Sequence, residues 1–114
     1  MAAQPVDLEH LARYTGGDAA LNAEILGLFD GQVSELMDKL ARAGLSGDRK
    51  TWHDIAHSLK GAARGIGAFS FADQAARAEA FDPTHNAREA TAIFTLLKAQ
   101  GEIVSAFIRT YLGR

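Results

Sequence analysis

The sequence predicts an all-α protein: an up-down-up-down antiparallel four-helix bundle with a short extra helix at the N-terminus. The apolar residues recur at intervals of three and four rather than alternating, and the chain holds only two prolines, Pro5 and Pro83. Its 114 residues, 47% of them hydrophobic and 23% charged, suit one globular domain, which we expect to span residues 1–114. Short connections favour antiparallel neighbours and hence the up-down order.

Turn and capping residues predict the first two helices. Pro5, whose fixed φ suits a first helical turn, predicts a short helix over residues 5–14 that the following Thr-Gly-Gly ends. Asp18 is a suitable N-cap for a long second helix that reaches the region of Gly44. Residues 44–47 are expected to connect it to the next helix. The buried stripe of the second helix is expected to contain Leu21, Ile25, Leu28, Leu36 and Leu40.

Three more helices complete the expected bundle. The third is predicted over residues 48–66, with glycines closing it. Ser70 followed by Asp73 resembles a capping box and predicts a fourth helix over residues 70–80. The last helix is predicted over residues 86–112, and its buried side is expected to contain Ala90, Ile93, Leu97, Val104, Phe107 and Tyr111.

Charge and composition exclude several classes of function. The formal net charge is −2 and no run of five Lys or Arg occurs, so nucleic acid is not an expected partner. The absence of cysteine excludes disulfides, thiolate metal sites and cysteine nucleophiles. No stretch approaches about 18 consecutive apolar residues and the N-terminus lacks a signal-peptide pattern, which predicts a cytoplasmic protein that does not bind a membrane.

The predicted third helix carries the candidate chemistry. At about 100° per residue, its apolar residues share one face that runs from Trp52 to Ile66. His57 lies away from this face and is expected to point into solvent. The same polar face carries His53, Lys60, Gly61 and Arg64.

The neighbours of His57 indicate phosphoryl transfer. Gly61, one turn later, costs the helix about 1 kcal/mol relative to Ala, but it leaves room for a bulky reacting group such as the phosphorylated side chain of another protein. Lys60 and Arg64 bring positive charge within a turn or two of the imidazole. A neutral ring nitrogen is nucleophilic near pH 7, and a nitrogen–phosphorus bond is labile enough for onward transfer.

At this point the sequence resembles a known family. AHSLKGAA (residues 56–63) followed by IGA (66–68) is similar to the signature of histidine-containing phosphotransfer (HPt) domains, whose core is His-x-x-Lys-Gly on an exposed helix face. Upstream, VDL (6–8), GGD (16–18) and LF (28–29) resemble the usual opening of the family. The resemblance covers most of the chain and implies the same helical bundle.

By this resemblance, His57 is the phosphorylated residue, Lys60 a positive neighbour of the phosphoryl group, and Gly61 the gap that admits the partner. In the chemotaxis-kinase type of the family, a Glu 22 residues after the His binds the imidazole, and here this position is Glu79. Many free-standing members have Gln instead, but Gln74 stands at a different offset. We expect Glu79 rather than Gln74 to fix the tautomer of His57 and make its other nitrogen a better nucleophile.

The resemblance implies a carrier in a multistep His-Asp phosphorelay of two-component signalling. It would take a phosphoryl group from a receiver-domain aspartate and pass it to another receiver. The chain contains no P-loop motif, so we expect neither a kinase nor another enzyme. The expected partners are receiver domains of a hybrid histidine kinase and of a response regulator. They would supply Mg²⁺, while this chain would act as a monomer without a cofactor of its own.

The surface around His57 is the expected docking face, with His53, Ser58 and Gln74 as candidate members. Two other hypotheses remain open at this stage. One is a helical adaptor that docks a response regulator without accepting phosphoryl. The other is a metal-binding bundle that uses His53 and His57, whose four-residue spacing on one helix face can chelate zinc, although no third ligand is identified.

Overall fold

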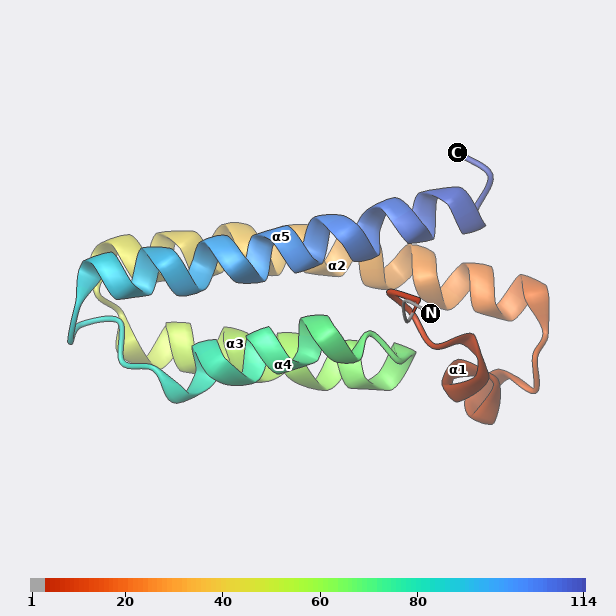
Figure 1. The fold of residues 1–114 in the computed structure, drawn as a ribbon, viewed down its shortest axis with the longest axis horizontal. Helices are drawn as coiled ribbons and strands as arrows, with labels where there is room; N and C mark the ends of the chain where they lie inside the picture. The colour runs from red at the N-terminus through yellow and green to blue at the C-terminus, as the bar shows by residue number, and fades with distance from the viewer. Residues whose placement is uncertain (1–3) are drawn as a thin grey trace.

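Five α-helices and no strand make up residues 4–114, the part of the chain that the structure, a computed structural model, describes (Figure 1). The predicted all-α class is confirmed. The helices are α1 (Leu8–Thr15), α2 (Ala19–Ser46), α3 (Arg49–Ile66), α4 (Phe69–Ala80) and α5 (Ala87–Tyr111).

Four of the helices pack around one core. α3 contacts α2 and α4, and α5 also contacts α2 and α4, so these helices form a closed ring in which α3 and α5 occupy opposite corners. Figure 1 shows α2 and α5 side by side above the α3–α4 pair, with the chain reversing direction at each connection. The short α1 lies at one end of the ring, where it contacts α2 and α3.

Trp52 anchors α3 in the core and brings it close to α2. Its buried indole N–H donates to the main-chain carbonyl of Ala78 on α4, at 2.7 Å. A Cβ at Gly44 would lie 2.9 Å from the indole carbon Cζ3, so only glycine allows this close approach. The expected connector at residues 44–47 is wrong in part. α2 continues to Ser46 and ends at Gly47, which has a left-handed conformation.

The first helix begins three residues later than Pro5, at variance with the prediction. Asp7 is the N-cap, and its carboxylate accepts a hydrogen bond from the main-chain N–H of His10 at 3.1 Å. The main-chain N–H of Asp7 donates to the carbonyl of Gly67 at 3.0 Å, which ties the start of α1 to the end of α3. Val6 is completely buried ahead of the helix. These tertiary contacts outweigh the preference of proline for a first helical turn.

The capping box expected at Ser70 and Asp73 is also wrong. α4 begins at Phe69, its N-cap is Ala68, and no side chain caps it. Gly67 ends α3 in the left-handed conformation (φ 81°), and Ala68 is fully buried. Only two residues connect the helices, so α4 has already begun where Ser70 would have to cap it.

The buried stripe of α2 has a different phase from the expected one. Leu40 is buried and Ile25 and Leu36 are half-buried, but Leu21 and Leu28 are 38% and 69% exposed. Each buried residue in the first turns of α2 stands one position after an expected one, so the buried face is rotated by one residue and Leu21 and Leu28 lie outside it. The residues that α2 does bury are Asn22, Leu26, Phe29, Val33, Leu40 and Ala43.

The last helix follows the prediction closely. Asn86 caps α5, with its side-chain oxygen accepting from the N–H of Glu89 at 3.0 Å. Phe107 and Tyr111, expected in the core, are only half-buried. By length and composition alone α5 could cross a membrane, and it is the one such helix among the described residues. This is weak support for a membrane segment, because the inner side of α5 forms part of the core through Ala90, Ile93, Leu97, Val104 and Ile108.

Candidate functional site

His57 projects into solvent from the middle of α3. Its side chain is 66% exposed, whereas Ala56 and Leu59 beside it are completely buried. α3 starts at the N-cap Asp48, whose carboxylate accepts from the N–H of Thr51 at 3.1 Å. The cap sets where α3 begins, and the burial of its apolar face sets how the helix is rotated. Together they place the imidazole of His57 on the outer side.

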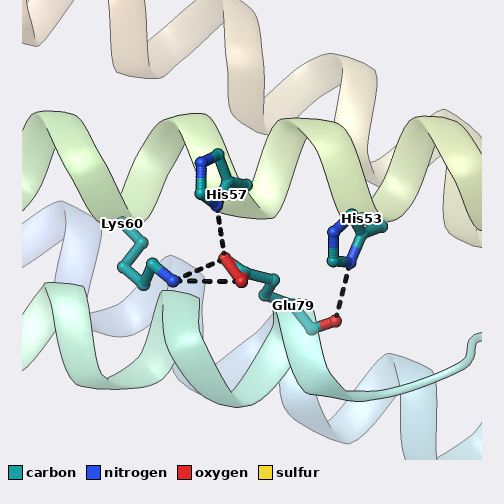
Figure 2. A network of polar contacts seen from close by, with 4 residues as sticks. All are labelled: His53, His57, Lys60 and Glu79. Atoms are coloured by element: carbon teal, nitrogen blue, oxygen red, sulfur yellow. Dashed lines mark hydrogen bonds and ion pairs between the residues drawn. The ribbon is translucent and has the colours of Figure 1, made fainter.

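Glu79, near the end of α4, reaches across to His57 (Figure 2). One of its carboxylate oxygens, Oε2, lies 3.1 Å from Nδ1 of His57. The ammonium of Lys60 lies 3.0 Å from Oε1 and 2.9 Å from Oε2 of the same carboxylate. The side chains of Lys60 and Glu79 are only 19% and 18% exposed. A single carboxylate thus joins two residues of α3 that stand one turn apart.

The charges around Glu79 decide how the proton of His57 is placed. The hydrogen bond from Lys60 lowers the pKa of Glu79; partial burial acts in the opposite direction, and the hydrogen bond from His57 supports the lowering. Glu79 is therefore ionised near neutral pH and can only accept hydrogen bonds. Nδ1 of a neutral His57 must then carry the proton, which leaves the lone pair on Nε2.

His53 belongs to the same network, one turn before His57 on α3. The two imidazole rings are stacked with centroids 6.5 Å apart and planes 14° from parallel. Nδ1 of His53 lies 3.2 Å from the main-chain carbonyl oxygen of Glu79. Because a carbonyl can only accept, Nδ1 of His53 is the donor.

The other predicted residues are placed around this network. Gly61, Ser58 and Arg64 are exposed on α3, and no atom outside the helix lies within 4 Å of the position a Cβ of Gly61 would take. Gln74 makes no hydrogen bond to this network within the described part of the chain. It is half-buried, and its Oε1 is buried without a hydrogen-bond partner among the described residues. Glu79, and not Gln74, contacts the imidazole of His57.

Sequence reasoning missed two features of the site. The helical wheel placed Lys60 on the polar face, but α4 covers most of its side chain, and its charge is directed at Glu79. The hydrogen bond of His53 was also missed, because it depends on where α4 ends. The spacing of His57 and Lys60 on one side of α3 was the available signal that both could share a partner on α4.

A cleft of about 510 Å³ opens beside His53. The charged side chains near it are paired: Arg49 lies 3.7 Å from Asp82, and Lys50 lies 2.7 Å from Asp54. The cleft therefore does not offer unpaired positive charge to an anion. Its lining consists of Arg49, Lys50, His53, Glu79, Ala80, Phe81 and Asp82.

The metal-binding hypothesis finds no support in residues 4–114, where no group of three His, Cys, Asp or Glu side chains could hold a metal ion. Zinc–nitrogen bonds are about 2.0–2.1 Å long, so one ion could join the rings of His53 and His57 only if they tilted toward each other. Their observed hydrogen bonds to Glu79 hold them apart and parallel.

Comparison with known families identifies the family of this chain. The Hpt domain model matches residues 24–104, which contain α3, α4 and most of α2 and α5. The chain belongs to the Hpt domain family. Hpt domains are phosphocarrier modules of phosphorelay signalling that interact with receiver domains, and they are not catalytic enzymes. No curated protein and no solved structure matches the chain significantly.

Proposed function

We propose that this Hpt domain is an intermediate carrier in a multistep His-Asp phosphorelay, and that His57 is its phosphoryl acceptor. The observation that carries this proposal is the exposed imidazole of His57, whose Nδ1 is held by the ionised carboxylate of Glu79 while Nε2 has no hydrogen bond to any residue of 4–114. His57 would accept the phosphoryl group from an aspartyl phosphate of one receiver domain. It would then pass the group to an aspartate of a second receiver.

The transfer step uses the two ring nitrogens differently. The lone pair on Nε2 of His57 attacks the phosphorus of the aspartyl phosphate. The new N–P bond forms as the P–O bond breaks, and the electron pair of that bond goes to the carboxylate of the receiver. The ring gains positive charge, which Glu79 stabilises by accepting the hydrogen bond from Nδ1–H. Transfer to the second receiver is the same step in reverse.

Lys60 contributes to the site through its ion pair with Glu79. Its ammonium contacts both carboxylate oxygens, which keeps the carboxylate ionised and directed toward α3. Gly61 leaves open space beside the imidazole for the receiver, and the exposed Arg64 adds positive charge to the same helix. The chain would need no cofactor of its own, since the receiver is expected to bring the Mg²⁺ that neutralises the phosphoryl oxygens.

The proposed partners are receiver domains of a hybrid histidine kinase and of a response regulator. The docking surface would lie on α3 around His57 and include Ser58 and His53, which are exposed there. We propose a cytoplasmic monomer, and light scattering of the purified chain tests the oligomeric state. A dimer would contradict this part of the proposal.

The decisive experiment is incubation with isotopically labelled, phosphorylated receiver domains. We expect the wild type to take up label that is labile in acid and stable in base, as a phosphohistidine is. His57→Gln should take up none and stay folded, because residue 57 is mostly exposed. His85→Gln is the matched control, since His85 is exposed in the α4–α5 connection, and it should keep the label.

The outcomes separate the hypotheses. Label on His57→Gln would show that another residue accepts the phosphoryl group. A wild type that binds phosphorylated receivers but takes up no label would support the adaptor hypothesis instead.

A further inference from the structure

Side chains of α3 take the place of a glycine cap at the end of α4. The last four carbonyls of a helix lack partners within the helix, and α4 runs directly into the extended residue Phe81 (φ −98°, ψ 136°). The carbonyl of Ala78 accepts from the indole N–H of Trp52 at 2.7 Å and from the N–H of Phe81 at 3.1 Å. The carbonyl of Glu79 accepts from Nδ1 of His53 at 3.2 Å.

We propose that His53 is a positioning residue for the phosphoryl acceptor, and that it acts through Glu79. Glu79 is held at both of its ends: its main-chain carbonyl by His53, and its carboxylate by His57 and Lys60. The two histidines thus contact opposite ends of one residue on the neighbouring helix, as Figure 2 shows. This inference rests on the proposed role of His57 and adds a residue to it.

The need for such a contact arises from the place of Glu79 in α4. Glu79 is the second-last residue of the helix, within the last turn, where helices fray most easily. Opening of this turn would carry the carboxylate away from Nδ1 of His57. Trp52 fixes the preceding carbonyl from the core side, and His53 fixes that of Glu79 from the exposed side.

Two substitutions at position 53 separate positioning from helix stability. In His53→Asn, the side-chain nitrogen Nδ2 stands as many bonds from the main chain as Nδ1 of histidine does, so the donor is kept. In His53→Ala the donor is lost. Ala is a better helix former than Asn, so a role in helix stability alone would favour the Ala variant. The proposed role favours the Asn variant.

The test compares initial rates of phosphoryl uptake by His57 from a phosphorylated receiver. We expect His53→Ala to lower the rate about 3- to 10-fold through misplacement of the carboxylate, and His53→Asn to recover most of this loss because it keeps the donor. Glu79→Ala keeps the main-chain carbonyl but removes the carboxylate, so adding His53→Ala to it should have no further effect. A wild-type rate in His53→Ala, an equal loss in the Asn variant, or a persisting loss in the Glu79→Ala background would overturn the proposal.

A second measurement does not depend on phosphoryl transfer. Nitrogen-15 NMR of the imidazole reports how much of neutral His57 carries its proton on Nδ1. We expect His53→Ala to lower this fraction and His53→Asn to preserve it. An unchanged fraction in His53→Ala overturns the positioning role, even if the wild type takes up no label. If the wild type takes up no label but the expected NMR change occurs, only the proposed function is contradicted.

Discussion

Gly61 provides a direct test of how a partner reaches His57. A Cβ at Gly61 would meet no atom outside the helix within 4 Å, so Gly61→Ala adds a methyl group without a clash. Ala stabilises a helix interior by about 0.5–1 kcal/mol relative to Gly, which for a domain of this size raises Tm by about 2–4 °C. Residues four apart on a helix have Cβ atoms about 5–6 Å apart, so this methyl group would stand beside the imidazole.

We therefore expect Gly61→Ala to be more stable than the wild type and yet slower. The methyl group occupies space that the phosphorylated aspartate must enter, and a misplacement of about 1 Å can slow transfer by ten- to a hundredfold. Thermal unfolding followed by circular dichroism measures the first effect. Initial rates of uptake from a phosphorylated receiver measure the second.

Gly65→Ala is the matched control on the same helix. Gly65 is exposed, lies two turns from His57, and likewise has no atom outside the helix within 4 Å of the position its Cβ would take. It should gain stability and keep a transfer rate within about twofold of the wild type. A wild-type rate in Gly61→Ala would refute the steric reasoning. Equal slowing in both variants would instead implicate helix flexibility.

Other contacts predict measurable outcomes. Glu79→Gln should slow phosphoryl uptake by His57 about tenfold without changing the far-ultraviolet circular dichroism, because an amide stabilises the charged ring less than a carboxylate does. An unchanged rate would show that this contact does not contribute to transfer. The pKa of Glu79 is lowered in the folded state, so the unfolded chain binds more protons in acid. The contribution of ionised Glu79 to the free energy of unfolding should be complete above the ordinary carboxyl pKa and should vanish as the pH falls through the lowered pKa of the folded state. Urea unfolding of wild type and Glu79→Gln at several pH values measures this contribution. Gly44→Ala should cost about 1–3 kcal/mol in urea unfolding, because Trp52 lies 2.9 Å from the new Cβ; a neutral result would mean that the α2–α3 contact adjusts easily.

Periodicity was sufficient to predict the helices, because burial of one face is a property of each helix alone. The helix ends were less predictable, since they depend on contacts between distant segments. Asp7 begins α1 where its main-chain N–H meets the carbonyl of Gly67. Leu28 had the right spacing for the core of α2 but is exposed, while the adjacent Phe29 is buried, because apolar residues occur on more than one face of α2 and spacing alone does not reveal which face meets the other helices.

The polar face of the candidate site was predictable for the same reason as the helices. Helical geometry alone places His53, His57 and Gly61 on one side of α3. Glu79 came instead from the family resemblance, because the distance between two helices cannot be obtained from periodicity. The burial of Lys60 was not predictable, since it results from the packing of α4 against α3.

A carrier must form a phosphohistidine and then give the phosphoryl group away, so neither state can be stabilised much more than the other. The arrangement around His57 meets this requirement. Glu79 contacts the ring nitrogen opposite the proposed N–P bond, and Lys60 is directed at Glu79 rather than at the free nitrogen. In the proposed function, the chain would fix the tautomer of His57 as the nucleophile and would leave open space at Gly61, one turn away on α3. Charge stabilisation of the transferring group would then come from whichever receiver is docked, which allows the same site to accept and to donate.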